Sequence, residues 1–322
     1  MKNESQITFQ SAFAEDTYKG LSSYPKFLYS KYIYDEKGDK LFQQIMDMPE
    51  YYLTSCEFDI LEMNAPEIAD SFQHPEGVDL IELGAGDGKK TKVLLKELLK
   101  KEYDFQYLPV DISQHALDDL QQSLKKELPA VKVKPQQGTY FKTLEKLSEY
   151  NSRKKVILVL GSNIGNLSHK EAVNFLKNIQ TAMSKEDMLF MGFDQKKDPQ
   201  VILNAYNDES GITAAFNKNL LERINRELEA NFDLDAFRHW ETYNPETGTA
   251  KSFLVSETAQ TVRIKSLELE VKFDKWESIH TEISQKYDDH IVQWLADNAG
   301  LVIENDFHDA ANCYKNYIFR RK

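Results

Sequence analysis

From about residue 78 the chain alternates short apolar runs with amphipathic segments of helical period, and this alternation predicts a parallel sheet with crossover helices. The run at 156–160 is the most apolar, so we place it at the centre of the sheet, where both faces are covered. Ser168 and Glu171 form the pattern of a capping box that opens a helix. The five runs that predict strands are 78–83, 107–110, 131–133, 156–160 and 188–193.

After Asp198-Pro199 the pattern changes to long helical stretches, followed by segments of strand period. The segment 267–273 alternates apolar and charged residues, which is typical of a half-exposed antiparallel strand. From His290 a helix and two further strands would rejoin the first sheet. We therefore predict an α/β, Rossmann-like sheet with helices on both faces and a second, α+β domain. The predicted boundaries are 60–196 with 286–322 for the first domain and 10–59 with 197–285 for the second.

Composition narrows the classes of partner. With 322 residues, of which 41% are hydrophobic, the chain can bury a sizeable core. A net charge of −12 argues against a nucleic-acid partner and favours a small-molecule substrate. Cys56 and Cys313 form no metal-binding or disulfide pattern, which suits a reducing cytoplasm and predicts no metal. The polar N-terminus and the absence of a long apolar run predict neither export nor a membrane span.

The glycine-rich turn Gly84-Ala85-Gly86-Asp87-Gly88 follows a predicted strand and opens a predicted helix. Such a turn lets the backbone approach a ligand and offers unpaired N–H groups, although structural glycines alone would give the same pattern. The third glycine of a dinucleotide fingerprint would fall at Lys89 and is missing, which weighs against an NAD-dependent oxidoreductase. Asp111, at the end of the second strand, is placed to accept both ribose hydroxyls of an adenosine-bearing ligand. Lys90 is either a partner for a ligand carboxylate or a solvated lysine on a helix face.

Longer stretches, dispersed in order nearly from end to end, resemble the ergothioneine-pathway histidine N-alpha-methyltransferases. They are Tyr34-Asp35, Leu41-Phe42, Pro49-Glu50-Tyr51-Tyr52, Glu82-Leu83-Gly84-Ala85-Gly86, Leu160-Gly161-Ser162-Asn163-Ile164-Gly165-Asn166-Leu167, Ala205-Tyr206-Asn207-Asp208, Gly211-Ile212-Thr213-Ala214-Ala215-Phe216-Asn217, Asn225-Arg226-Glu227-Leu228, Asp233-Leu234-Asp235-Ala236-Phe237 and Thr281-Glu282-Ile283-Ser284.

The resemblance implies a class I methyltransferase sheet that binds S-adenosylmethionine and a second domain that binds the substrate. Members of this family methylate the alpha-amine of L-histidine three times, which gives hercynine, the betaine precursor of ergothioneine. The resemblance also implies a monomer. It places the donor at Gly84, Gly86, Lys90 and Asp111. Where the family usually carries Gly-Asp-Phe for the adenine, this chain has Gly138-Thr139-Tyr140. Thr139 and Tyr140 therefore stand at the predicted adenine contact, with Gln136 or Gln137 as substitutes.

For the amino-acid substrate, the resemblance implies Tyr51, Asn166 and Tyr206 as residues that hold it, with Tyr34 near the amine and Phe42 and Thr213 also in the site. Glu282 and Ser284 would read the imidazole. A purely structural role stays open for each of these residues. Asn166 would cap the next turn, the tyrosines would pack, and Glu282 would be an i,i+4 partner of Lys286 on a helix.

Two further positions bear on the acceptor. A methionine that commonly walls the imidazole in the family aligns with Ser252, which would loosen selectivity for the side chain. The seven histidines, including His239 and His308, show no nucleophile or metal pattern, and we assign them to surface or packing roles.

Methyl transfer from a sulfonium needs positioning rather than a metal or a covalent nucleophile. We hypothesise that Asn166, Tyr34 and Tyr206 receive the amine as it loses its proton to water, because no histidine or lysine base is identifiable. One alternative is an N-methyltransferase for another aromatic amino acid or indole amine, such as a tryptophan derivative. Another is a noncatalytic cofactor-binding regulator, which would lose the amine pocket.

Overall fold

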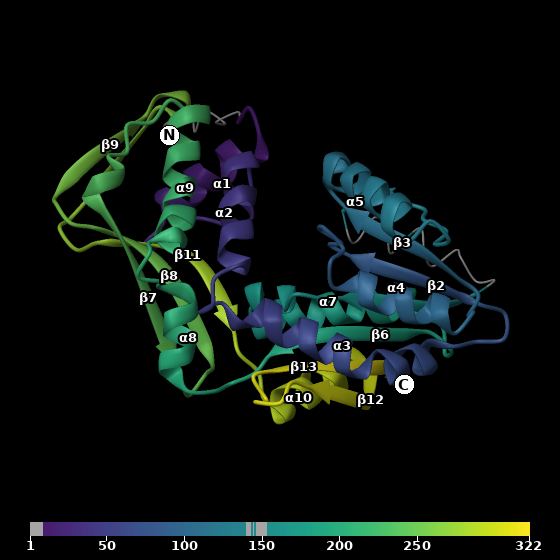
Figure 1. Cartoon of the computed structure of the whole chain (residues 1–322). Coiled ribbons are helices and arrows are strands. Elements are labelled where there is room, and N and C mark those ends of the chain that lie inside the picture. Colours follow the sequence, from purple (N-terminus) through teal and green to yellow (C-terminus); the bar gives the residue numbers. More distant parts are fainter. Residues whose placement is uncertain (1–8, 140–142, 144, 146–152) are drawn as a thin grey trace, which may run out of the picture. The chain divides into compact units, whose positions relative to one another are not determined.

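The computed structural model describes residues 9–139, 143, 145 and 153–322, and the chain divides into two compact units (Figure 1). The smaller unit comprises Met1–Tyr51 and Lys197–Ser284, and the larger unit comprises Tyr52–Lys196 and Gln285–Lys322. The predicted boundary at residue 60 lies inside α3 (Tyr52–Phe72), a continuous helix that packs on the sheet of the larger unit. The division therefore falls at the start of this helix.

The larger unit is built on a seven-stranded sheet with the order β12-β13-β6-β5-β2-β3-β4. Among these strands, β13 alone runs in the opposite direction to the others. This arrangement confirms the Rossmann-like class I methyltransferase sheet. The strands are β2 (Val78–Leu83), β3 (Phe105–Asp111), β4 (Gln136–Gln137), β5 (Lys154–Val159), β6 (Met188–Asp194), β12 (Leu301–His308) and β13 (Tyr314–Arg321).

Apolar runs explain the middle of this sheet. All residues of β2, β5 and β6 are buried, and β5 occupies the centre, as its run of apolar residues predicts. The predicted strand at 131–133 is wrong in its position. Val133 makes only an isolated bridge with Tyr107, and the edge strand is β4, which pairs with the end of β3. At 131–133 the side chain of Val131 is buried, and Lys132 and Lys134 hydrogen-bond to Tyr107 of β3, but this single bridge is too short to form a strand.

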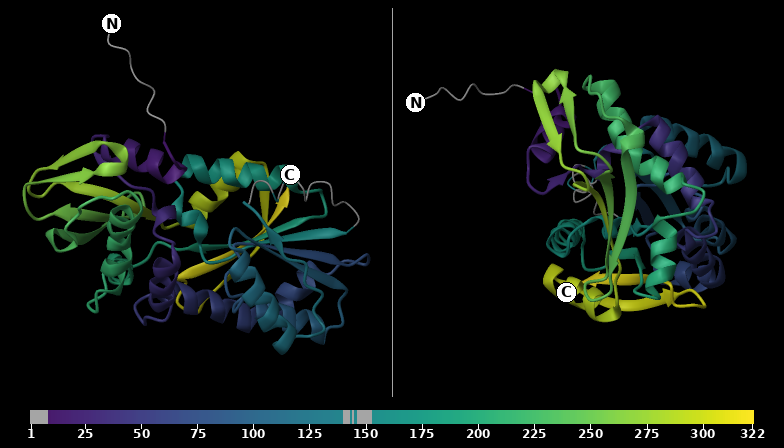
Figure 2. Two further views of the ribbon diagram at one scale, coloured as in Figure 1. Left: turned by 90° about the horizontal axis from the view of Figure 1, so that it is seen from above. Right: turned by 90° about the vertical axis from the view of Figure 1, so that its left-hand side faces the viewer.

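Helices cover both faces of the sheet (Figure 2). On one face α7 and α10 pack against each other and against strand residues such as Ile157 and Leu189, while α3 and α4 pack together. Ser168 and Glu171 form the predicted capping box at the start of α7. The helices are α4 (Thr91–Lys100), α5 (Gln114–Glu127), α7 (His169–Ala182), α10 (Asp289–Ala299) and the 3-10 turn η2 (Asn163–Asn166).

The smaller unit combines helices with two antiparallel-rich sheets, which confirms its α+β class. Its four-stranded sheet has the order β1-β11-β8-β7, and β9 pairs with β10 alone. In β10 the apolar positions Val271 and Phe273 are buried and the charged ones are exposed, as predicted. Its elements are α1 (Ala12–Leu21), β1 (Lys26–Phe27), η1 (Ser30–Tyr32), α2 (Glu36–Met46), α8 (Pro199–Tyr206), α9 (Ile212–Glu227), η3 (Leu234–Ala236), β7 (Phe237–Asn244), β8 (Thr249–Ser256), β9 (Gln260–Ile264), η4 (Lys265–Leu267), β10 (Leu269–Phe273) and β11 (Ser278–Gln285).

In the larger unit, the three segments next to the unit boundaries are joined by an ion pair and hydrogen bonds. The Lys286 ammonium lies 2.7 Å from Asp194 Oδ2, and both side chains are almost completely buried. The Tyr52 hydroxyl donates to the same carboxylate at 2.9 Å, and Lys196 N donates to the carbonyl of Tyr287 at 2.7 Å. A paired, hydrogen-bonded burial of this kind fixes three chain segments at one point.

Within the described part of the chain, no helix is both long enough and apolar enough to span a bilayer.

Candidate functional site

The glycine-rich turn lies at the carboxyl end of β2, where ligands bind in sheets of this type. Gly84, Gly86 and Gly88 have φ angles of 76°, 51° and 64°, in the left-handed region that glycine adopts without a steric penalty. Gly84 N donates to Val110 O at 2.9 Å, which ties the turn to β3. A Cβ added at Gly86 would meet no atom within 4 Å, so open space lies beside this part of the backbone.

Asp111 ends β3 at the same edge of the sheet, because Leu83 of β2 is paired with Val110. Its Oδ1 accepts the N–H of Ser113 at 2.9 Å, and the side chain is partly exposed. The carboxylate is thus held beside the glycine turn and remains accessible. An open glycine cradle and an adjacent carboxylate fit the phosphate-free, adenosine-bearing donor that the sequence predicts.

Lys90 is not a solvated lysine, so this alternative is wrong. Its ammonium lies 2.5 Å from Glu57 Oε2, and the exposed fractions of the two side chains are 23% and 0%. The sequence reasoning missed Glu57. A signal was present, since Glu57 falls on the apolar stripe of α3 that includes Leu53, Ile60 and Leu61.

A second buried carboxylate, Glu82, lies directly before the turn. Thr91 Oγ1 donates to its Oε1 at 2.6 Å, and the Tyr107 hydroxyl donates to its Oε2. Burial raises the pKa of Glu82 to about 7, against the opposing effect of these two hydrogen bonds and of the charge of Lys90. In the sequence Glu82 appears only as part of a motif, with no predicted role.

The predicted adenine contact lies at the edge of the described segment. Thr139 is exposed, and Tyr140 lies outside the described residues. Gln136 and Gln137 pair with Val110 and Asp111, so both glutamines stand on the strand next to the predicted ribose carboxylate. They remain the substitutes that the sequence proposes.

Asn166 ends the 3-10 turn that follows β5, and its side chain is exposed. The next helix, α7, is capped by Ser168, so the interpretation of Asn166 as a cap for it is wrong. The turn begins at Ser162, a residue with a left-handed φ of 56° whose Oγ accepts the N–H of Asp194 at 3.0 Å. The fold therefore presents Asn166 at the carboxyl edge of the sheet in the larger unit.

The smaller unit brings most of the predicted substrate residues together as an aromatic cluster. The ring of Tyr34 lies edge-on to Phe42, with centroids 5.6 Å apart, and 5.4 Å from Phe216. Phe42 lies 6.3 Å from Tyr51, and Tyr51 lies 6.1 Å from Tyr206. These distances are those of favourable edge-to-face aromatic pairs.

A hydrogen bond joins this cluster to Ser284 on β11. The hydroxyls of Tyr206 and Ser284 are hydrogen-bonded at 2.8 Å. Residues 278–285 form a strand, so the interpretation of Glu282 and Lys286 as an i,i+4 helix pair is wrong. Desolvation of the Tyr34 phenol and then the charge of Glu282 raise its pKa well above the ordinary value, although 37% of the tyrosine surface is exposed.

Thr213 stands at the start of α9 and is almost fully buried. Its N–H donates to Asp208 Oδ1 at 2.8 Å, and the N–H of Ile212 donates to Oδ2 at 2.9 Å. The Asp208 carboxylate thus satisfies the first amides of the helix. Sequence reasoning missed this role of Asp208.

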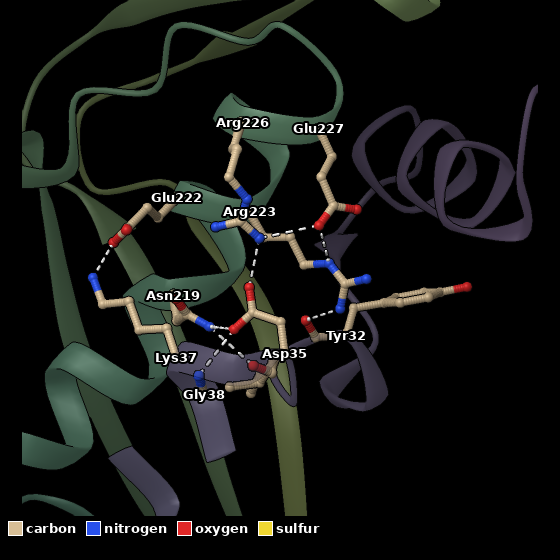
Figure 3. A network of polar contacts seen from close by, with 10 residues as sticks. Tyr32, Asp35, Lys37, Gly38, Asn219, Glu222, Arg223, Arg226 and Glu227 are labelled. Atoms are coloured by element: carbon tan, nitrogen blue, oxygen red, sulfur yellow. Dashed lines mark hydrogen bonds and ion pairs between the residues drawn. The ribbon is translucent and has the colours of Figure 1, made fainter. Parts of the chain in front are cut away.

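The backbone on both sides of Tyr34 is fastened to α9 (Figure 3). Asn219 Nδ2 donates to Ile33 O at 2.9 Å and to Asp35 Oδ1 at 2.8 Å. Arg226 adds an ion pair with Asp35 Oδ2 at 2.6 Å. Burial, which raises the pKa of Asp35, is outweighed by its hydrogen-bond donors, and the pKa falls to about 2. This network holds Tyr34 in place through its neighbours.

His239 is a buried residue, as the packing assignment predicts, but it also holds Tyr206. Its Nε2 lies 2.8 Å from the carbonyl oxygen of Tyr206, and its Nδ1 lies 2.9 Å from Asn217 Nδ2. Because a carbonyl only accepts, Nε2 carries the proton and Nδ1 accepts from the amide. Burial lowers the pKa of His239, which keeps this neutral form.

Ser252 is buried on β8, opposite Glu241 of β7. The serine hydroxyl donates to Glu241 Oε2 at 2.7 Å. A polar pair therefore stands at the position where the family commonly has a methionine.

The predicted residues thus fall into two groups, each described within its own unit. Gly84, Gly86, Lys90, Asp111 and Asn166 belong to the larger unit. The other group, Tyr34, Phe42, Tyr51, Tyr206, Thr213, Glu282 and Ser284, belongs to the smaller unit. Among the described residues, no three His, Cys, Asp or Glu side chains are grouped as metal ligands would be.

Comparison with known proteins gives one consistent result. The family model described as "Histidine-specific methyltransferase, SAM-dependent" matches residues 13–321. The histidine N-alpha-methyltransferase of Mycolicibacterium smegmatis is 37% identical over 90% of this chain and 89% of its own length. Ergothioneine biosynthesis protein 1 of Schizosaccharomyces pombe is 30% identical over 91% of this chain, which spans 39% of that protein. A more distant relative, 26% identical over 92% of this chain and 90% of its own length, is a 4-dimethylallyltryptophan N-methyltransferase of Penicillium roqueforti.

Proposed function

Because the chain belongs to the histidine-specific, S-adenosylmethionine-dependent methyltransferases, we propose that it methylates the alpha-amine of L-histidine three times and forms hercynine. The product would feed ergothioneine biosynthesis. The observation that carries this proposal is the aromatic cluster of the smaller unit together with the Tyr206–Ser284 hydrogen bond and the nearby charge of Glu282.

The donor would lie at the carboxyl edge of the larger unit's sheet. The open backbone at Gly86 would receive it, Asp111 would accept the ribose hydroxyls, and Lys90 would face the methionine carboxylate. When bound, S-adenosylmethionine supplies a methyl group on an already activated sulfonium. The protein then needs to supply orientation, which contributes up to about 7–11 kcal/mol in well-oriented reactions.

Residues of the smaller unit would hold the acceptor. Glu282 would accept one imidazole N–H and the Ser284 hydroxyl would serve the other ring nitrogen. A ring without these groups would leave the two site residues unpaired, and this selects histidine. Phe42 and Thr213 would wall the site, while Tyr51 and Tyr206 would hold the amino-acid end.

The amine must be neutral when it attacks. Burial and the Glu282 charge keep the Tyr34 phenol protonated, because both raise its pKa. Tyr34 would therefore act as a hydrogen-bond partner of the amine and not as a base. The proton would pass to water as Asn166, Tyr34 and Tyr206 receive the amine.

A direct test is to incubate the purified protein with labelled donor and a panel of amino acids and to read mass shifts of one, two and three methyl groups. We expect trimethylated histidine. Product on a tryptophan derivative with none on histidine would instead support the indole-amine alternative.

Two substitutions test the assigned residues. Asn166→Ala should lower the turnover, and Glu282→Ala should chiefly weaken histidine binding. Glu270→Ala is a matched control for the second, because Glu270 is an exposed carboxylate on β10 of the same unit. Unchanged kinetics in either site variant would remove that residue from the mechanism.

We further propose that the enzyme acts as a monomer on a small-molecule substrate in the cytoplasm, without nucleic acid, membrane or metal. The absence of any Cys/His metal pattern in the sequence and the acidic net charge of −12 support this. Light scattering at micromolar concentration tests the oligomeric state, and dialysis against a chelator should leave the activity unchanged.

A further inference from the structure

We propose that Glu57 is a positioning residue for the donor site, one that holds Lys90 and the backbone of Gly161 where the methionine carboxylate of the donor would bind. The proposal rests on the proposed function for the identity of the donor. It concerns one side chain of α3 to which neither sequence motif nor family resemblance gave a role.

The Glu57 carboxylate accepts hydrogen bonds from three separate segments of the larger unit. Its Oε2 accepts from Lys90 Nζ at 2.5 Å and from Gly161 N at 2.7 Å. Its Oε1 accepts from Asn316 Nδ2 at 2.9 Å. Lys90 follows β2, Gly161 follows β5, and Asn316 lies on β13, so the carboxylate joins segments that are far apart in the sequence.

The Glu57 carboxylate needs these hydrogen-bond partners because it is buried. The exposed fraction of the Glu57 side chain is 0%, and a carboxylate without solvent is strongly disfavoured unless it is paired and hydrogen-bonded. Close packing extends beyond the carboxylate, since a Cβ added at Gly192 would lie 2.3 Å from Glu57 Oε1. The orientation of the carboxylate is therefore fixed by its surroundings.

Unlike Glu57, Lys90 is partly exposed to solvent and so can contact a ligand. Its side chain retains an exposed fraction of 23%, whereas its partner has none. An ammonium carries three N–H donors, and one of them is directed to Glu57. The cation is thus anchored from the protein side while it stays accessible from the solvent side.

Gly161 completes the arrangement. It has a left-handed φ of 82° and no side chain, and the Lys90 ammonium lies 3.5 Å from the position that a Cβ would take there. β2 and β5 are adjacent parallel strands, so the segments that follow them share the carboxyl edge of the sheet. Glu57 therefore holds the partly exposed Lys90 ammonium beside the backbone of Gly161 at this edge.

The test compares two ligands that differ in the group in question. S-adenosylhomocysteine carries the methionine-type carboxylate, whereas 5′-methylthioadenosine lacks it and keeps the adenosine. Binding of both is measured by calorimetry to the wild-type protein and to Glu57→Gln, which retains the shape of the side chain but not its charge.

We expect Glu57→Gln to weaken S-adenosylhomocysteine binding by roughly tenfold or more, and 5′-methylthioadenosine binding by less than about twofold. Lys90→Met should give the same pattern, and the double variant should lose little beyond either single one, since both act on one interaction. Glu57→Asp, which keeps the charge, should recover part of the affinity for S-adenosylhomocysteine. Glu62→Gln, an exposed position on the same helix, is the matched control.

Equal weakening of both ligands by Glu57→Gln would show that Glu57 only supports the fold, and would overturn the proposal. Unchanged S-adenosylhomocysteine binding would overturn it as well. If Glu57→Gln does not fold, Glu57→Asp decides: it must weaken S-adenosylhomocysteine binding selectively and by less than Lys90→Met does, and equal weakening of both ligands would overturn the proposal. A wild-type protein that binds neither ligand would refute the proposed function itself, which is a separate outcome.

Discussion

Replacing Glu82 by glutamine should change how the stability of the protein depends on pH. The side chain is buried directly before the donor turn, where Thr91 and Tyr107 donate to its two oxygens. A glutamine keeps the shape, accepts from the threonine through its oxygen and donates to the tyrosine oxygen through its amide. The substitution therefore removes only the titratable group.

The magnitude follows from the pKa of Glu82, which burial raises from its ordinary value of 4.5 to about 7. Since the folded state holds the proton more tightly than the unfolded state, the contribution of Glu82 to stability is complete below pH 4.5. It is lost as the pH rises through about 7. The full loss is about 3 kcal/mol, at about 1.4 kcal/mol for each unit of pKa. Roughly 2 kcal/mol of it falls between pH 5.5 and 8.

The assay is urea denaturation of wild type and Glu82→Gln at several pH values across this range. Other titrating groups, such as Asp35 and His239, act equally on both proteins and cancel in the difference. The stability of the wild type relative to the variant should therefore fall by about 2 kcal/mol from pH 5.5 to pH 8. A difference that stays constant with pH would refute the reasoning, because it would mean that Glu82 keeps one charge state throughout.

Three further outcomes are expected. Gly192→Ala should lower the melting temperature in a thermal scan by the equivalent of about 1–3 kcal/mol, since its Cβ would lie 2.3 Å from Glu57 Oε1; an unshifted melting curve would contradict the packing. The pKa of Asp208 is about 2, because hydrogen bonds outweigh the opposing effect of burial, so the stability it contributes above pH 3.8 should be lost as the pH falls through about 2. In Asp208→Asn, the free energy of unfolding measured by denaturation should fall less steeply at low pH. An unchanged fall would contradict the role assigned to Asp208. Ser284→Ala should raise KM for histidine with a smaller effect on kcat, because its hydroxyl, bonded to Tyr206, is assigned to the imidazole; a lower kcat at constant KM would argue for a different role.

Much of the fold could be predicted because it rests on local pattern. The buried runs of β2, β5 and β6 and the capping box at Ser168 depend on neighbouring residues in the chain, and each appears where the pattern indicates. The edge strand β4 was misplaced because so short a strand is fixed by its pairing with β3 and not by its own residues.

The site was predicted less completely, for a related reason. The roles of Glu57 and His239 depend on partners that come from distant parts of the sequence, such as Gly161 for the first and Tyr206 for the second. A hydrophobic pattern shows at most that a polar residue falls on a buried face, as it does for Glu57 on α3. It does not show which donors will meet it there.

The ion pair and the hydrogen bond at the boundary of the larger unit have a consequence for how such enzymes diversify. They join Asp194 to Lys286 and Lys196 to Tyr287. The two ends of segment 197–284 follow hydrogen-bonded neighbours, so this segment is topologically a long insertion between β6 and α10 of the larger unit. Loops closed at fixed ends tolerate changes in length at a cost that grows only with the logarithm of their size. We therefore predict that this segment can be exchanged between relatives, together with α2 because α2 packs on α9, without disturbing the sheet of the larger unit.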